Sequence, residues 1–297
     1  MSFERIVVGV DFSSSVNQAA IWVHNYFAPE ALLTLVHAVE PVSVPPFLRH
    51  RFASDADRLE ADLHDATGRV EELINQLGLA RAAPMARAGK PHEVLNDVAH
   101  EIDATLTVIG SHGPVVRPWL RLGSTAERLL RRSRTSLLIG RGEMHDAPRR
   151  LLLAADDATI TPELLARAVS LRKQFDAELL AVHVLSNAAF SHMASIEAAH
   201  SPSAEVAHRR LAEDIRAEAA QWLAEIGSVS ADAGHLQVEV PHGDPGAEIL
   251  SAADRFGADL IVIGRYGLGR VIPAVLGSVL GSVAHGARCP VLVVVED

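Results

Sequence analysis

The sequence has very little cysteine: Cys289 is the only one in 297 residues, so no disulfide can form within the chain. The chain also lacks an opening segment of the secretory type, in which a charged region precedes an apolar one. Residues 271–284 carry no formal charge, but this stretch is shorter than the about 18 to 20 apolar residues that a bilayer requires. These absences indicate a protein of the reducing cytoplasm with no membrane partner.

Positive charge is scarce as well. Lys and Arg number 27 against 37 Asp and Glu, which gives a formal net charge of −10. Proteins that bind nucleic acid broadly recruit its phosphates with an excess of Lys and Arg. We therefore expect no nucleic-acid partner, and any binding of phosphate must be local.

The motifs of several enzyme classes are missing. There is no GxxxxGK[ST], whose lysine grips the terminal phosphates in P-loop NTPases. There is no GxSxG, no context for a cysteine nucleophile and no convincing pair of carboxylates. The 15 histidines form no HExxH and no Cys/His cluster. We predict no catalytic residue, no metal ligand and no efficient turnover.

What the chain does contain is the glycine pattern GxxGx9GS, present twice with unchanged spacing. The two copies are Gly110, Gly113, Gly123 and Ser124, and Gly264, Gly267, Gly277 and Ser278. Each copy follows an apolar run, residues 106–109 or 260–263, that is typical of a buried parallel strand. Glycine permits positive φ and a close approach of the backbone, and the N-terminus of a helix after Gly-Ser attracts anions. The pattern predicts two phosphate-binding turns.

The whole chain repeats in the same way. A shift of 154 residues carries Gly89 onto Gly243 and the first glycine pattern onto the second. Near the start of each half the shift is 145 or 146, which places Asp11 opposite Asp156 and His37 opposite His183. We infer that one module has been duplicated.

Strands and helices alternate in both halves. The predicted strands are residues 5–10, 32–39, 82–87, 151–155, 179–185 and 236–240. The predicted helices are residues 14–27, 54–77, 91–102, 203–226 and 245–256, with a further one capped by Thr161 and starting at Pro162. Alternation of this kind predicts two α/β domains, each a doubly wound parallel sheet covered by helices. We place the domains at residues 1–143 and 148–297, on either side of a polar connection.

Ligands of such sheets bind beyond the carboxyl ends of the strands, where Asp11 and Asp156 stand. Each Asp could accept hydrogen bonds from a ligand, or it could cap the following helix. Ser124 and Ser278 could likewise cap a helix or donate to a phosphate.

Other polar residues have simpler interpretations. Four arginines lie in the spacers of the glycine patterns and could contact phosphate, although solvated arginines are commoner there: Arg117, Arg121, Arg265 and Arg270. His112, between the first glycines, is a weak contact candidate. His37 and His183 are interpreted as strand histidines bonded to backbone. The cluster Arg128, Arg131, Arg132 and Arg134 is interpreted as a solvated helix face.

Taken with VGVDFS and LAADDA at the first strands and GKP or GDP before the third helices, the glycine patterns make the chain resemble the universal stress protein family. The resemblance covers nearly all of both halves and points to a tandem member. It implies a five-stranded parallel sheet of order 3-2-1-4-5 in each domain. It also implies ATP or another adenine nucleotide as the ligand, with or without Mg²⁺, its adenine near the Asp and the residue after the second-strand His.

Carried over by motif position, the resemblance assigns one nucleotide site to each half. The first site would use Asp11, Ala38, Ile109, Gly110, Gly113, Gly123, Ser124 and Thr125. The second would use Asp156, Val184, Ile263, Gly264, Gly267, Gly277, Ser278 and Val279. The second half departs from the pattern at Asp157, an extra carboxylate that would repel phosphate. Ser136 stands where the second half has Pro290, at the edge that the family uses for pairing.

The resulting hypothesis is a cytoplasmic, ATP-binding stress-response regulator with a nucleotide site in each domain and at most slow ATP hydrolysis. It would form a homodimer or an intramolecular pseudo-dimer and act through an unknown regulatory protein partner. The alternative is an interaction scaffold of the same fold that holds no nucleotide. A nucleotidyl-transferring enzyme would need a catalytic Lys or His motif at the phosphates, and none is found.

Overall fold

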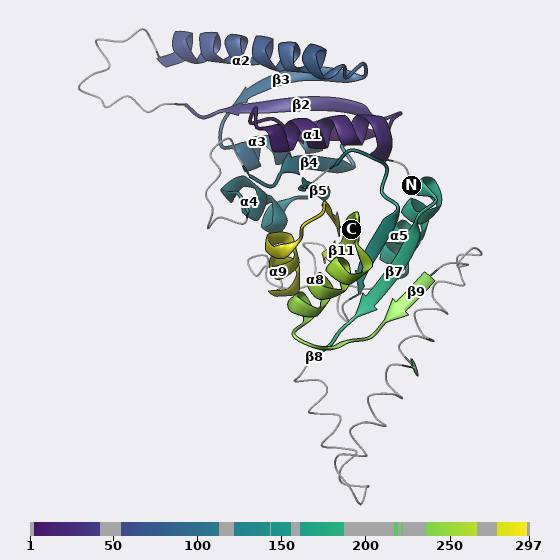
Figure 1. Ribbon diagram of the computed structural model, residues 1–297. Helices are drawn as coiled ribbons and strands as arrows, with labels where there is room; N and C mark the ends of the chain where they lie inside the picture. Colours follow the sequence, from purple (N-terminus) through teal and green to yellow (C-terminus); the bar gives the residue numbers. More distant parts are fainter. Residues whose placement is uncertain are drawn as a thin grey trace, which may run out of the picture. The chain divides into compact units, whose positions relative to one another are not determined.

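The computed structural model describes residues 3–41, 55–112, 122–142, 144–155, 161–186, 217–218, 221, 236–265 and 278–295. It divides into two compact units, Met1–Ala147 and Pro148–Asp297, which are called unit 1 and unit 2 below (Figure 1). Among the described residues, no helix combines the length and the apolar character needed to span a membrane.

Unit 1 is built on five parallel strands. They are β1 (Arg5–Gly9), β2 (Leu32–Val39), β3 (Ala82–Ala88), β4 (Leu106–Gly110) and β5 (Ser136–Gly140). Their neighbours run in the order β3-β2-β1-β4-β5. The strand order therefore reverses between β1 and β4, and the carboxyl ends of these two strands flank the point where ligands bind in open α/β sheets.

The helices of unit 1 connect the strands. They are α1 (Ser14–Trp22), α2 (Asp55–Leu77), α3 (Pro91–Glu101) and α4 (Ser124–Arg132). Right-handed crossovers place α3 and α4 on the face opposite α1 and α2, because the chain changes direction along the sheet after β3. The sheet interior is apolar, and Ile6, Val8 and Leu106 are fully buried.

The predicted helix over residues 14–27 is split in two. Regular α1 ends at Trp22 and continues as a π-helical turn, η1 (Val23–Phe27). The Phe27 ring stacks on Trp22 and on Phe3, with centroids 5.2 and 5.3 Å apart. The wider turn accommodates this buried aromatic stack, a tertiary demand that local periodicity does not reveal.

Unit 2 repeats the arrangement. Its main strands are β6 (Arg150–Ala155), β7 (Glu178–His183), β9 (Leu236–Glu239), β11 (Leu260–Arg265) and β12 (Val291–Val295), with neighbours in the order β9-β7-β6-β11-β12, all parallel. Its described helices include α5 (Pro162–Phe175), α8 (Pro245–Phe256) and α9 (Ser278–Gly286). The sequence does not predict the short parallel pair β8 (Leu185–Ser186) and β10 (His242–Gly243). The predicted helix over 203–226 falls almost entirely outside the described residues.

The predicted α/β class with two domains of parallel strands is confirmed. So is the start of α5, where the Thr161 hydroxyl accepts a hydrogen bond from Leu164 N at 3.0 Å and Pro162 takes the first helical position. The glycines that precede α3 and α8 have a backbone reason to be glycine. Gly89 has φ of 139° and Gly243 has φ of 154°, a region that side chains disfavour.

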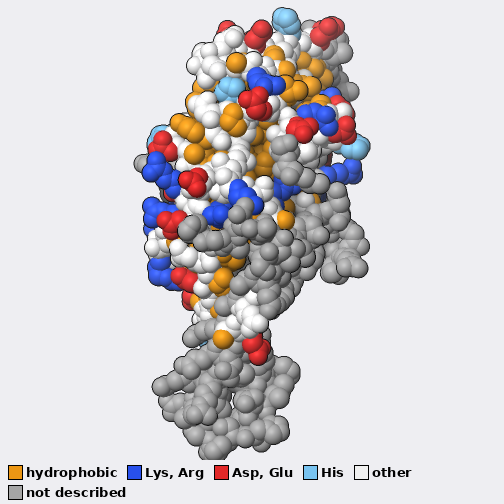
Figure 2. Space-filling model, turned by 90° about the vertical axis from the view of Figure 1, so that its right-hand side faces the viewer, with side chains coloured by type: hydrophobic (Ala, Val, Ile, Leu, Met, Phe, Trp, Pro, Cys, Tyr) orange, Lys and Arg blue, Asp and Glu red, His pale blue; other side chains and the backbone are white. Residues whose placement is uncertain are grey.

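The visible surface carries both signs of charge. Figure 2 shows Lys and Arg side chains interspersed with Asp and Glu on the face it presents. Among the residues that Figure 2 colours by type, mixed charge of this kind gives no continuous positive area for a nucleic-acid backbone.

Candidate functional site

A cavity of about 200 Å³ opens in unit 1 at the carboxyl ends of β1, β2 and β4 and at the N-termini of α3 and α4. Its walls include seven of the eight residues that the sequence assigns to the first site: Asp11, Ala38, Ile109, Gly110, Gly123, Ser124 and Thr125. The eighth, Gly113, lies outside the described residues. Pro91 and Leu95 of α3 also line the cavity. The sequence places Pro91 in the GKP motif but does not assign it to the site.

One residue holds the two ends of the glycine pattern together. Ser111 N donates to Gly140 O at 3.0 Å, and Gly123 N donates to Ser111 O at 2.9 Å. The start of α4 is therefore tied to the end of β4 by its main chain. This tie brings Gly110 and Ser124 to the same cavity although 14 positions separate them in the sequence.

Two glycines of the pattern differ in what surrounds them. A Cβ at Gly110 would lie 2.6 Å from Ser15 Oγ and 3.1 Å from Val16 N, so packing against the start of α1 excludes a side chain there. Among the residues that the structure describes, a Cβ at Gly123 would meet only Ser111 O, at an ordinary 3.6 Å. Gly123 has φ of −71°, and Gly110 is not among the positive-φ glycines. Neither position therefore uses the tolerance of glycine for positive φ.

The N-terminus of α4 faces the cavity without a side-chain cap. The N-cap residue is Gly123, and no side chain there accepts a hydrogen bond, whereas Ser13, Thr161 and Asp244 cap α1, α5 and α8. Ser124 is the first helical residue, so the interpretation of Ser124 as a cap is wrong. The first amides of the helix are oriented toward the cavity side, where they form a positive end for an anion.

Asp11 does not cap the helix that follows it. Its Oδ1 accepts a hydrogen bond from Ser13 N at 2.9 Å, while Ser13 Oγ accepts from Val16 N and forms the cap of α1. Within the described residues no hydrogen bond reaches the other carboxylate oxygen of Asp11. The carboxylate thus has one oxygen fixed by its own loop and one left for a ligand in the cavity.

His37 forms the backbone contact predicted for it. Its Nδ1 donates to Val10 O at 2.7 Å, because a carbonyl can only accept. The Phe12 ring packs against the His37 ring with centroids 4.8 Å apart, and the guanidinium of Arg69 lies 4.2 Å from the Phe12 centroid. Phe12 has φ of 60°, which is uncommon for an aromatic residue. These contacts fix the wall of the cavity beside Asp11 and Ala38.

The second site is described only in part. Val184 follows β7 and is buried, Ile263 and Gly264 lie near the end of β11, and Ser278 and Val279 begin α9. Asp156, Gly267 and Gly277 lie outside the described residues, as do Arg117, Arg121 and Arg270. Arg265 occupies the position of Ser111, and burial lowers the pKa of its guanidinium. No group of three or more His, Cys, Asp or Glu in the described chain is close enough to hold a metal ion.

Comparisons with known proteins give one consistent result. A model of the universal stress protein family matches residues 2–141 and again residues 148–295. Universal stress protein Rv2623 of Mycobacterium tuberculosis is 27% identical over 305 residues, which cover 98% of this chain and 96% of the relative. Universal stress protein G of Salmonella typhimurium is 31% identical over 144 residues, 47% of this chain and 99% of that protein.

A solved structure is similar over the full length. The crystal structure of a universal stress protein from Archaeoglobus fulgidus has a TM-score of 0.67 and 17% identity, and the match covers 100% of both chains. At this identity the similarity shows the fold.

Proposed function

Because this chain belongs to the universal stress protein family, we propose that it is a stress-response regulator that binds ATP or a related adenine nucleotide in the unit 1 cavity. The second set of residues, at the ends of the unit 2 strands, forms a second site. The alternative is a scaffold of the same fold that holds no nucleotide.

The observation that supports this proposal is the cavity itself, since it gathers seven residues from distant parts of the chain. Phosphates fit at its α4 end, where the helix has no side-chain cap and Ser124 and Thr125 offer hydroxyls. Adenosine fits at the other end, where Asp11 and the main chain of Ala38 can exchange hydrogen bonds with a base or a ribose.

Gly123 is the position at which the fit of the cavity to a nucleotide can be tested. The described residues leave room for a Cβ there, so their packing does not explain the glycine. A ligand that approaches the backbone from the cavity does explain it. The enclosed volume, about 200 Å³, is below the roughly 300 to 1,000 Å³ of common ligand pockets, so part of a nucleotide would project into solvent.

In this proposal the side chains and amides of the cavity bind and orient the nucleotide, and none of them acts as a nucleophile. Mg²⁺, when it accompanies the phosphates, would supply positive charge to them. We propose that turnover does not exceed slow hydrolysis and that occupancy is transmitted to a regulatory protein partner. We also propose a cytoplasmic protein that forms a homodimer or an intramolecular pseudo-dimer.

Thermal or urea unfolding of ligand-free protein with added ATP tests the proposal. ATP at about 1,000 times its dissociation constant should stabilise the folded protein by about 4 kcal/mol per site. The scaffold alternative predicts no stabilisation at any ATP concentration. Mass spectrometry of small molecules that copurify with the protein tests independently whether it binds a nucleotide. Analysis of the products after incubation with ATP tests whether the protein is a nucleotidyl-transferring enzyme.

A further inference from the structure

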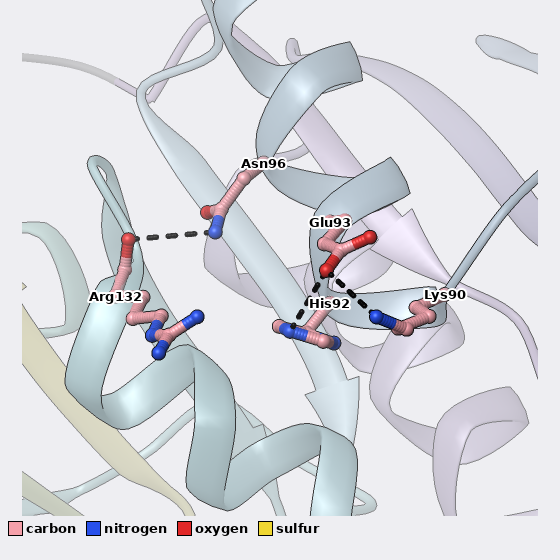
Figure 3. Close-up of polar contacts among 5 residues, drawn as sticks. All are labelled: Lys90, His92, Glu93, Asn96 and Arg132. Atoms are coloured by element: carbon pink, nitrogen blue, oxygen red, sulfur yellow. Dashed lines mark hydrogen bonds and ion pairs between the residues drawn. The ribbon is translucent and has the colours of Figure 1, made fainter.

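A group of cations lies where α3 and α4 of unit 1 pack together. Lys90 is the N-cap residue of α3, Arg128 and Arg132 belong to α4, and His92 of α3 is only 5% exposed. The Oε1 atom of Glu93 lies 3.4 Å from Lys90 Nζ and 3.8 Å from His92 Nε2 (Figure 3). This single carboxylate lies between one cation, Lys90, and an imidazole that carries charge only when it is protonated.

The local field is positive at this place. Burial is the largest cause that lowers the pKa of His92 and Arg128 is the next, and Arg132 and Lys90 add to them against the opposing effect of Glu93. Within the described residues, neither Arg128 nor Arg132 has a carboxylate at ion-pair distance. Two guanidinium groups therefore stay without a counter-ion in this part of the structure.

Lys90 and Arg128 do not line the cavity themselves, but each lies close in the chain to a residue that does. Lys90 directly precedes Pro91, which lines the cavity. Arg128 is four residues after Ser124, another lining residue, and so lies on the same helix face about 5.4 Å further along the axis. Side chains on a helix lean toward its N-terminus, which carries the Arg128 guanidinium toward Ser124. Arg132 is a further turn away.

Unit 2 builds the same helix pair without the cations. The shift of 154 places Asp244, Gly246, Ser282 and Gly286 opposite Lys90, His92, Arg128 and Arg132. A Cβ at Gly246 would lie 2.5 Å from Ser282 Cβ, so α8 and α9 approach closely where unit 1 holds two large polar side chains. The fold does not require Lys90 or Arg128, and their presence in unit 1 calls for another explanation.

We propose that Lys90 and Arg128 form a cationic rim at the phosphate end of the unit 1 cavity, and that this rim selects nucleoside triphosphates over monophosphates. The inference rests on the nucleotide site proposed above. Coulomb attraction grows with the charge of the ligand, so the rim favours a triphosphate most and AMP least. Unit 2 carries Asp244 and Ser282 at these positions, and its own cation, Arg265, belongs to a different element.

Calorimetric titrations of the full-length protein with ATP, AMP and inorganic tripolyphosphate test the rim. Arg128→Ser installs the residue of unit 2 and should weaken binding of ATP and tripolyphosphate about tenfold but that of AMP less than about twofold. Lys90→Ala should act in the same direction. Raising the salt concentration should weaken ATP binding more in the parent than in either variant. Arg134→Ser is the matched control, because it removes an equal charge beyond the C-terminal end of α4.

The outcomes separate the two proposals. An equal loss for ATP and AMP, or the same loss in Arg134→Ser, overturns the rim and leaves the nucleotide site standing. Binding of tripolyphosphate that depends on Arg128, without binding of ATP or AMP, overturns the nucleotide site and with it the selection of nucleoside triphosphates, and leaves only a cationic site for polyphosphate. If neither ATP nor tripolyphosphate binds the parent, both proposals fail.

Discussion

At the scale of residues, two glycines of one motif are glycine for different reasons. Gly110 has no space for a side chain because Ser15 and Val16 of α1 pack against it. Gly123 has an ordinary backbone conformation, and the described part of the chain leaves space for a Cβ there. Only at Gly123 does the absence of a side chain point to something outside the folded chain, and a substitution there separates binding from stability.

Gly123→Val should abolish ATP binding in unit 1 while the protein stays folded, because the added methyl groups occupy the approach to the α4 N-terminus. Isothermal titration calorimetry measures the loss, and thermal unfolding without nucleotide checks the fold. Gly123→Ala is the milder form and should weaken binding in the same direction.

The matched control is Gly110→Ala, which should lower the free energy of unfolding by about 1 to 3 kcal/mol, as overpacking does. A Gly123→Val protein that binds ATP like the parent would contradict the phosphate-binding turn proposed at the N-terminus of α4. A Gly123→Val protein with a free energy of unfolding as low as that of Gly110→Ala would also contradict it, because the loss of binding would then follow from the loss of stability.

At the scale of elements, most of the fold is predictable from the sequence. Strand β2 and helix α8 begin and end where the sequence predicts them, since Leu32–Val39 is a largely apolar run and Pro245 follows a capping Asp. The pair β8 and β10 escapes prediction because two-residue strands have no period. The π-helical turn escapes because it depends on Phe3, which is distant in the sequence.

The candidate site is predictable to a similar extent. The glycine pattern and Asp11 are visible in the sequence, and the structure gathers the described members of the first set in one cavity. The sequence could not show that Arg128 is a neighbour of His92 and Lys90. Thirty-eight positions separate the two cations, and the way α3 packs on α4 follows from side-chain shape, which a linear pattern does not encode.

The α3–α4 contact should make stability depend on pH. The folded state holds the pKa of His92 below its ordinary value of 6.5, mainly through burial and then through Arg128. Between the two pKa values the unfolded chain binds more protons, so stability is fully present above pH 6.5 and falls as the pH drops toward the folded pKa.

Urea unfolding from pH 7.5 to 5 checks this dependence against His92→Gln, which does not titrate. The parent should lose more stability than the variant as the pH falls, by the uptake of at most about one proton. Hydrogen exchange should locate the loss in α4 and spare α9, whose partner helix carries Gly246 in place of His92. Parallel pH profiles of parent and variant would contradict the assignment.

At the scale of the whole molecule, duplication has produced two units with the same strand order and different chemistry. The net charge of −10 opposes a polyanionic ligand in general, so local cations and the α4 amides must supply the attraction in unit 1. Unit 2 has Asp157 after Asp156 and Asp244 in place of Lys90. We expect the two sites to differ in affinity.

A calorimetric titration of the parent with ATP should therefore resolve two binding steps of unequal affinity. Gly123→Val should remove the tighter step and Gly277→Val the weaker one, because each substitution blocks its own site. The double variant should bind no ATP. Removal of both steps by one substitution would refute two independent sites.

The close approach of Gly246 to Ser282 also couples these two positions of unit 2. A Cβ at position 246 would lie 2.5 Å from the Cβ of Ser282, so a larger residue fits there only if position 282 also loses its side chain or the two helices move apart. A change at one of these positions therefore limits which residues the other can accept.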